Sequence, residues 1–373
     1  MILSGADIIV KTLIEQDCDV VFGYPGGQII NVYDSLYKYQ GEIKHVLAAH
    51  EQGAAHAADG YARATGKTGV VLATSGPGAT NLVTGIATAY LDSVPMVAIT
   101  GNVMMSQLGS DSFQEIDITG ITLPITKHNY IVGSVEQLAD TIREAFKLAQ
   151  SGRPGPVLID VPKDIQIAKC EYTAKKPVKP EKRFAAKDVR LKEAASCINT
   201  ADRPFIYIGG GLINADAQQE VLELAETIDA PIGCSFMGIS GVPTEHPRFL
   251  GMQGMHGHYA SSVSMHHSDC IIALGVRFND RVTGDRSKFA SNARIVHIDV
   301  DGAELDKTVS AAAALRGDVK LTLKRLLPML KKTEHSEWAK IVDGYKKYEK
   351  EIADKRDGMT PVNVLNTLNG YLK

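Results

Sequence analysis

The residues best suited to proton transfer lie where an apolar run meets a run of small side chains. Glu51 follows the apolar residues 46–49 and precedes mostly small residues. A carboxylate in such surroundings is poorly solvated, which suits a group that exchanges protons near neutral pH. An acidic residue is also expected where a helix begins, because the positive end of the helix dipole favours it. The residues alone leave both interpretations open.

Two glycine-rich turns each follow an apolar, strand-like run. Gly76-Pro77-Gly78 could bring backbone close to a ligand at a helix start, but no Gly-Lys-Ser/Thr ending follows, so it is not a P-loop. Gly209-Gly210-Gly211 is similar to a dinucleotide phosphate turn, although the full G-x-G-x-x-G spacing is missing. An ordinary strand-to-helix turn is the alternative in both places.

Charged residues stand beyond the ends of two later strand patterns. Arg277 and Arg281 follow the apolar run 270–274, where ligands of open α/β sheets bind, and either could hold a carboxylate or phosphate. Asp299 ends another strand pattern and could accept from a ribose or ribityl hydroxyl. The alternatives are surface ion pairs for the arginines and loop capping for the aspartate. A metal site is not expected at the nearby histidines, because no acidic or thiol ligand accompanies them at a recognisable spacing: His256, His258, His266 and His267.

Composition bounds the class of protein. Apolar residues make up 44% of the 373 residues, and the net charge of −3 provides no basic field for nucleic acid or anionic lipid. The five cysteines are scattered, which fits a reducing compartment. No secretory leader pattern or apolar run of roughly 18 residues is present. We therefore expect a cytoplasmic protein with no nucleic-acid or membrane partner.

Helix and strand patterns alternate through most of the chain. Continuous apolar strands such as 69–74, 95–100 and 157–161 are typical of parallel sheets covered on both faces. The alternation predicts an α/β fold with two doubly wound parallel-sheet domains. We place them at residues 1–165 and 188–357, with a polar, proline-interrupted linker at 166–187 and the start of a further element at 358–373.

Taken in order, several longer segments resemble the acetohydroxyacid synthase (acetolactate synthase) catalytic subunit, a thiamin-diphosphate-dependent family. The resemblance runs from the N-terminus to the end of the chain. Its order and the length of its motifs make it specific. The matching segments are 23–27, 50–55, 74–81, 109–115, 151–157, 162–164, 254–257 and 276–284.

The resemblance implies a thiamin-pyrimidine-binding first domain and a central FAD-binding second domain. In that family a glutamate matching Glu51 contacts N1′ of the thiamin aminopyrimidine and exchanges a proton there. The other implied catalytic residues are Gln114 and Lys163, and the implied substrate contacts are Phe113 and Arg281. The implied cofactor-binding positions are Pro25, Gly26, Gly27, Glu51, Arg153, Gly209, Gly210, Gly211, His256, Gly275, Arg277 and Asp299.

The family also binds Mg²⁺ through a Gly-Asp-Gly motif and a later asparagine of a third, diphosphate-binding domain. We find no such motif here, so this chain would supply no metal ligand and would be inactive by itself. Three departures concern inhibitor sensitivity and flavin contacts, with Asn102, Met104 and Asn279 standing where the family usually has Gln, Pro and Asp.

The implied reaction decarboxylates pyruvate and joins the remainder to a second 2-keto acid, pyruvate or 2-ketobutyrate. It is the first common step of branched-chain amino-acid biosynthesis. The family forms homodimers or tetramers of catalytic subunits and can bind a small regulatory subunit. One alternative is another thiamin-diphosphate carboligase, such as a glyoxylate carboligase, against which Glu51 argues. The other is a non-catalytic, FAD-binding remnant.

Overall fold

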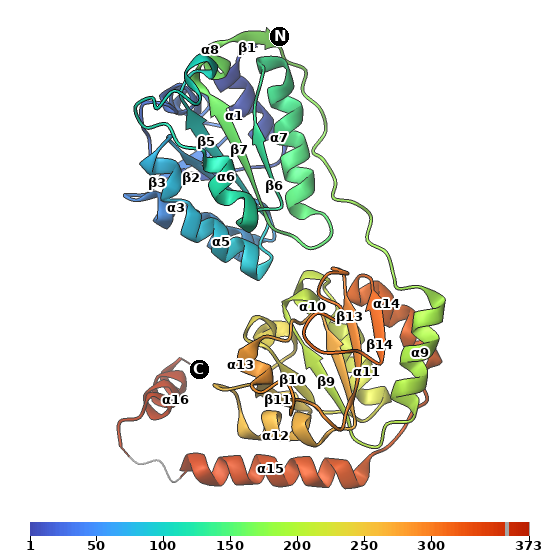
Figure 1. Cartoon of the computed structure of the whole chain (residues 1–373). Helices are drawn as coiled ribbons and strands as arrows, with labels where there is room; N and C mark the ends of the chain where they lie inside the picture. Colours follow the sequence, from blue (N-terminus) through green and yellow to red (C-terminus); the bar gives the residue numbers. More distant parts are fainter. Residues whose placement is uncertain (355–357, 373) are drawn as a thin grey trace. The chain divides into compact units, whose positions relative to one another are not determined.

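The computed structural model describes residues 1–354 and 358–372 and divides into two compact units, Met1–Lys182 and Arg183–Lys373 (Figure 1). Each unit contains a parallel six-stranded sheet, which confirms the predicted α/β fold class. The boundary between the units falls inside the predicted linker. The predicted end of the central domain at residue 357 lies outside the described residues, as does the last residue of the chain.

The first unit has the strand order β3-β2-β4-β5-β7-β6. Three of these strands are buried along their whole length, because helices cover both faces of the sheet. The chain runs outward from β2 to β3 and then returns to the other side of β2, so the strand order reverses between β2 and β4. Ligands of such sheets bind at this reversal, beyond the carboxyl ends of the strands. The strands are β2 (Val20–Gly23), β3 (Lys44–Leu47), β4 (Gly69–Ala73), β5 (Met96–Asn102), β6 (His128–Ile131) and β7 (Pro156–Pro162).

Two hydrophobic clusters hold the helices of the first unit against opposite faces of its sheet. On one face the alanines of the third helix allow close packing, and a Cβ on Gly85 would collide with Ala55. The longer helices are α1 (Gly5–Glu15), α2 (Ile30–Lys38), α3 (Glu51–Thr65), α5 (Val83–Asp92) and α7 (Val135–Gln150). Short turns are α4 (Pro77–Thr80), α6 (Ile118–Thr122), α8 (Lys163–Ile167), η1 (Met105–Gln107) and η2 (Leu123–Ile125).

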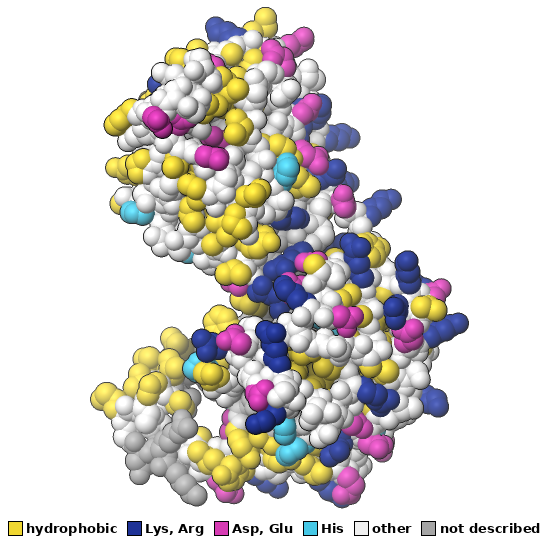
Figure 2. Space-filling view, in the orientation of Figure 1, with side chains coloured by type: hydrophobic (Ala, Val, Ile, Leu, Met, Phe, Trp, Pro, Cys, Tyr) yellow, Lys and Arg dark blue, Asp and Glu magenta, His cyan; other side chains and the backbone are white. Residues whose placement is uncertain are grey.

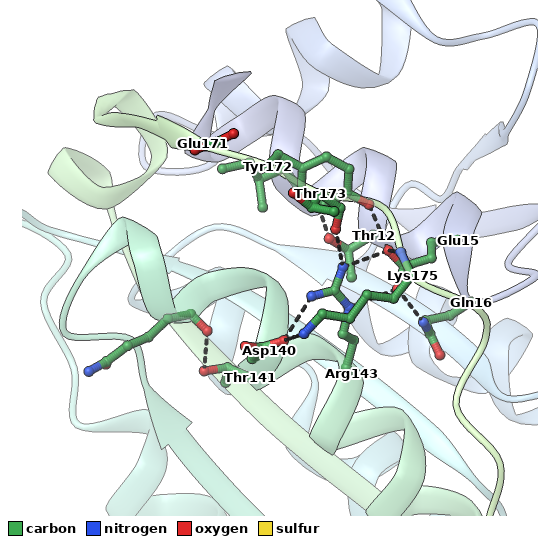
Figure 3. A network of polar contacts seen from close by, with 12 residues as sticks. Thr12, Glu15, Gln16, Asp140, Thr141, Arg143, Glu171, Tyr172, Thr173 and Lys175 are labelled. Atoms are coloured by element: carbon green, nitrogen blue, oxygen red, sulfur yellow. Dashed lines mark hydrogen bonds and ion pairs between the residues drawn. The ribbon is translucent and has the colours of Figure 1, made fainter. Parts of the chain in front are cut away.

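Most of the predicted linker is bound to the first unit. Within it, β8 (Lys169–Glu171) pairs antiparallel with β1 (Ile2–Ser4) near the N-terminus. Beyond β8, the backbone N–H of Lys175 donates to Glu15 at 2.8 Å, and that of Val178 donates to Gln16 at 2.9 Å. Arg143 of α7 donates to the Thr173 carbonyl of the same segment at 3.0 Å, and Figure 3 shows it beside Glu15 and Lys175. Composition marks the segment as polar, but the side chains of Glu15, Gln16 and Arg143 bond its backbone at residues 173, 175 and 178 and anchor it to the first unit.

The second unit has the strand order β11-β10-β9-β12-β13-β14, and its strands are all parallel. In order of appearance this is 3-2-1-4-5-6, the arrangement of dinucleotide-binding domains. The strands are β9 (Pro204–Ile208), β10 (Ile232–Cys234), β11 (Phe249–Met252), β12 (Cys270–Leu274), β13 (Arg294–Asp299) and β14 (Ala313–Arg316). The helices are α9 (Asp188–Asn199), α10 (Gly210–Asn214), α11 (Gln218–Thr227), η3 (Phe236–Gly241), α12 (Tyr259–His267), α13 (Asp280–Thr283), α14 (Val319–Leu326), η4 (Leu327–Met329), α15 (Ser336–Asp354) and α16 (Pro361–Tyr371).

Element boundaries follow the local signals where those signals are strong. The last helix begins at a clear local signal, because Thr360 caps it by accepting from the Asn363 N–H and Pro361 is its first residue. The helix α14 ends at Leu326 and is followed by a 3₁₀ turn that contains Pro328. Five short strands were not predicted, namely β1, β6, β8, β11 and β14.

Among the described residues, no helix is both long and apolar enough to cross a membrane.

Candidate active site and dinucleotide site

Glu51 is both a helix start and a buried carboxylate. It is the first residue of α3, after His50, whose Nδ1 accepts the N–H of Gln52 at 3.1 Å. The Glu51 residue is only 7% exposed. Asn81 Nδ2 donates to its Oε2 at 2.9 Å, and no described residue donates to its Oε1. One carboxylate oxygen is therefore held in place while the other is available to a ligand.

Small groups and one buried phenol surround this carboxylate. A Cβ on Gly78 would lie 3.2 Å from Glu51 Oε1 and 2.7 Å from Thr74 Cγ2, so a larger residue would fill the space. The Tyr33 hydroxyl is buried and has no hydrogen-bond partner among the described residues. Burial raises the pKa of Tyr33, and the charge of Glu51 adds to the shift, so the phenol stays protonated.

The turn that follows β2 packs against the end of β4. A Cβ on Gly26 would lie 2.5 Å from Thr74 Cγ2, and the N–H of Gln28 donates to Thr74 Oγ1 at 3.2 Å. Lys163 Nζ donates to the carbonyl of Gly27 at 3.1 Å. The strand order thus brings Glu51, Lys163 and the predicted residues of the turn to the carboxyl ends of the strands, around the reversal between β2 and β4.

Gln114 lies at the same carboxyl ends of the strands but belongs to a separate loop. Gly76 has φ +58°, and a Cβ there would lie 2.8 Å from the Gln114 carbonyl oxygen. Gln114 itself has φ +58°, a conformation that non-glycine residues adopt mainly where the surroundings enforce it. The Glu115 carboxylate accepts backbone N–H groups from Gly109 and Ser112, which lower the pKa of Glu115 and tie the loop together. Phe113, at the tip of this loop, is 84% exposed.

Arg153 is not part of this group. It precedes β7, and its Nε donates to Ser93 Oγ, which precedes β5, at 2.8 Å. Because all six strands are parallel, these positions lie at the amino ends of the strands, whereas Glu51 lies beyond their carboxyl ends. Within the first unit, Arg153 therefore cannot share a ligand atom with Glu51.

Sequence reasoning missed a buried carboxylate near the site. Asp160 of β7 is 1% exposed and accepts from Thr100 Oγ1 at 2.7 Å and Asn102 Nδ2 at 2.5 Å. Burial raises the pKa of Asp160 to about 6, although the two hydrogen bonds act in the opposite direction. The signal available in the sequence was an acidic residue inside an otherwise apolar strand pattern.

The glycine run of the second unit lies at the strand-order reversal between β9 and β12. The N–H groups of Gly209 and Gly211 donate to the carbonyls of Leu274 and Gly275 at 3.0 and 2.9 Å. A Cβ on Gly209 would collide with the Gly275 carbonyl, and Gly275 itself has φ +56°. The run therefore serves mainly the close approach of two strand ends. Two of its three N–H groups are bonded there and do not point at a phosphate.

The other predicted residues of the second unit lie around these strand ends with different degrees of constraint. Asp299 is buried and accepts the N–H of Asp301 at 2.8 Å, as the loop-capping alternative predicts. Met255 N–H donates to the Arg281 carbonyl at 2.9 Å, which joins two of the family-like segments. The side chains of Arg277, His256 and Arg281 are exposed. No group of three metal-ligating side chains occurs in the described part of the chain.

The fold and site define a class. A buried carboxylate beside a glycine turn in one α/β unit, followed by a dinucleotide-type unit, agrees with the two domains that the resemblance to thiamin-diphosphate enzymes implies. Residues 3–121 match the family "thiamine pyrophosphate enzyme, N-terminal TPP binding domain", and residues 191–326 match "thiamine pyrophosphate enzyme, central domain". The chain belongs to the thiamine pyrophosphate enzymes.

Within this family the chain is similar to acetolactate synthases. It is 44% identical to the acetolactate synthase large subunit of Buchnera aphidicola subsp. Acyrthosiphon pisum, across 98% of this chain and 66% of that protein. It is 44% identical to the acetolactate synthase isozyme 3 large subunit of Escherichia coli K12, across 93% of this chain and 61% of that protein. It is 48% identical to the acetolactate synthase of Arthrospira platensis, across 90% of this chain and 59% of that protein. The chain thus spans less than two thirds of the length of these relatives.

Proposed function

We propose that this chain supplies the pyrimidine-side half of an acetolactate synthase active site. The observation that carries the proposal is Glu51, a buried carboxylate with one oxygen held by Asn81 and the other available to a ligand. Bound thiamin diphosphate would supply the electron sink for loss of CO₂ from pyruvate and for joining the remainder to a second 2-keto acid. Pyruvate and 2-ketobutyrate are the proposed substrates.

The predicted site residues of the first unit each have a proposed role. Glu51 Oε1 would hold and release the proton of a ring nitrogen, while Asn81 fixes the orientation of the carboxylate. Pro25, Gly26 and Gly27 would let a flat ring approach the backbone. Gln114, Lys163 and the exposed Phe113 would line the approach to the reacting carbon.

We assign the flavin to the second unit. The strand-order reversal between β9 and β12 supports this proposal, since dinucleotides bind at such reversals. Gly210, whose N–H makes no hydrogen bond to a described residue, and the exposed Arg277 and His256 are the proposed contacts, with Asp299 for a hydroxyl. We propose that the Mg²⁺ ligands lie in the part of the relatives' length that this chain does not cover.

Assembly is part of the proposal. The Buchnera and Escherichia coli relatives are named large subunits, which supports a small regulatory partner for this chain. Figure 2 shows hydrophobic side chains at the surface of the first unit, and such exposed apolar surface favours a homodimer or tetramer. We propose the cytoplasm as its location. Large exposed apolar residues of this unit include Tyr37, Leu47, Leu91 and Leu123.

The test is acetolactate formation from pyruvate by the 373-residue chain with thiamin diphosphate, Mg²⁺ and FAD. It is run with and without the diphosphate-binding domain of a relative, supplied as a separate protein. Glu51→Gln keeps the size of the side chain and removes its acidity, and we expect at least about a hundredfold loss of activity. Glu136→Gln is the matched control, because Glu136 is also a first-turn helix acid but is exposed.

Three outcomes separate the hypotheses. Activity that needs the added domain and Glu51 supports the proposal. Flavin binding without activity under any condition would favour the non-catalytic remnant. A different product from 2-keto acids would favour another thiamin-diphosphate carboligase.

A further inference from the structure

We propose that Gln166 is a positioning residue that holds the turn Pro25–Gln28 in the shape needed beside the cofactor. The inference rests on the proposed function, because it concerns the same site. Gln166 belongs to α8, is 0% exposed, and lies far from the turn in the sequence. Its side chain would act through the turn and would need no contact with a substrate.

The Gln28 peptide is bonded on both sides. Its N–H donates to Thr74 Oγ1 at 3.2 Å, and its carbonyl accepts from Gln166 Nε2 at 2.8 Å. A Cβ on Gly101 would collide with the same carbonyl, so β5 passes directly against it. The turn is thus held by β4, β5 and α8, and its own Ile29 N–H to Gly26 carbonyl bond of 3.1 Å closes it.

The orientation of the Gln166 amide follows from its neighbours. Nε2 also donates to the carbonyl of Val161, at the end of β7, at 2.9 Å. Both neighbouring groups are carbonyl oxygens, so only the NH₂ side of the amide can face them. Oε1 is buried and has no partner among the described residues. The two donor bonds are therefore what this side chain contributes, and they link β7 to the turn.

A shift of this turn would reach the proposed cofactor site directly. Gly26 and Gly78 both pack against Thr74, and the Gly78 position lies against Glu51. Lys163, three residues before Gln166, donates to the Gly27 carbonyl. Short α8 therefore contributes one group that would face the ligand and one buried group that fixes the backbone the ligand contacts.

Amide hydrogen exchange of the cofactor-free 373-residue chain tests the positioning role. Gln166→Met has nearly the same volume and no donor, so we expect peptides covering residues 24–29 to exchange about tenfold faster. Gln150→Met is the matched control, because it also removes a glutamine donor: Gln150 Nε2 donates to Thr68 Oγ1 at 2.9 Å, at the amino ends of the strands, away from the turn. Exchange of residues 24–29 should not change in the control.

If Gln166→Met does not fold, Thr74→Val removes the other bond of the Gln28 peptide and should loosen the same peptides. Unchanged exchange in a folded Gln166→Met chain, or in Thr74→Val where that is the variant available, overturns the inference.

The second readout is the concentration of thiamin diphosphate that half-saturates activity in the complemented enzyme. We expect this value to rise at least about tenfold in Gln166→Met, with a smaller change in kcat, because a loosened turn weakens cofactor binding first. An unchanged half-saturation concentration beside faster exchange would overturn the link to the cofactor. Absence of activity in the unsubstituted chain would count against the proposed function alone, and the exchange result would still decide the positioning role.

Discussion

Replacing Arg143 by Met should remove a buried ion pair and its hydrogen bonds from the first unit. The guanidinium donates to Glu15 through Nε and Nη2, at 2.8 and 2.6 Å, and to Asp140 at 2.8 Å (Figure 3). It also reaches the Thr173 carbonyl at 3.0 Å, in the segment that leads out of the unit. Methionine retains the apolar stem and removes all of these donors.

The size of the effect follows from burial. The Arg143 and Glu15 side chains are only 9% and 4% exposed, so the substitution leaves a buried carboxylate without its cation. Breaking such a pair costs about 3–5 kcal/mol, and we expect the lower end, about 3 kcal/mol. Tyr172 and the Lys175 N–H still donate to Glu15, which limits the loss.

Denaturation in urea can separate the two units. The single tryptophan, Trp338, lies in the second unit, so its fluorescence follows that unit while circular dichroism follows both. With a slope of about 2 kcal/mol per molar urea, the first-unit midpoint should fall by about 1.5 M, and the Trp338 transition should not move. The control is Arg190→Met, which breaks an exposed pair with Glu193 worth less than about 1 kcal/mol.

The Arg143–Glu15 pair should also make the stability of the first unit depend on pH. Burial alone would raise the pKa of Glu15, but the hydrogen bonds from Arg143, Lys175 and Tyr172 outweigh it and lower the pKa. A lowered folded-state pKa stabilises the fold above the unfolded value of 4.5, and this stabilisation is lost as pH falls through the folded pKa. The difference between wild type and Arg143→Met should therefore shrink in acid.

Two results would refute this reasoning. A first-unit destabilisation below about 1 kcal/mol would mean that the pair behaves as a surface ion pair. The double variant Arg143→Met/Glu15→Gln should recover part of the loss, because it removes the unpaired charge. No recovery would mean that lost packing, and not the stranded carboxylate, is the cause.

Three further predictions concern groups near the two candidate sites. Because the folded-state pKa of Asp160 is raised to about 6, stability of the first unit should fall as pH rises from 3.8 to about 6. Urea midpoints of Asp160→Asn across this range should lack that fall. Gly26→Ala should destabilise the first unit by about 1–3 kcal/mol through overpacking, whereas Gly27→Ala, with nothing within 4 Å of its Cβ, should unfold at nearly the wild-type midpoint. Gly209→Ala should lower the Trp338 fluorescence transition by a similar amount, because its Cβ meets the Gly275 carbonyl; an unchanged transition would contradict this packing role.

Local patterns were sufficient where one segment carries its own signal. The continuous apolar run 204–208, followed by three glycines, is typical of a buried parallel strand, and the structure has a strand with these bounds. Short edge strands such as β6 and β14 were missed, since four residues of mixed polarity carry little periodicity. The polarity of residues 172–181 predicts a linker but does not say which side chains bond its backbone; the structure shows that Glu15, Gln16 and Arg143 do so.

The sequence by itself determined the α/β class, the family, and the position of Glu51 at a helix start after an apolar run. These depend on residue type and on spacing along the chain. Only the tertiary structure decided that Asn81 holds one oxygen of Glu51, that Gln166 donates to the Gln28 carbonyl, and that Arg153 lies at the amino ends of the strands, away from Glu51. Such pairs are set by the strand order β3-β2-β4-β5-β7-β6, which brings together residues far apart in the chain. Strand order depends on how whole apolar faces pack, and no single segment encodes it.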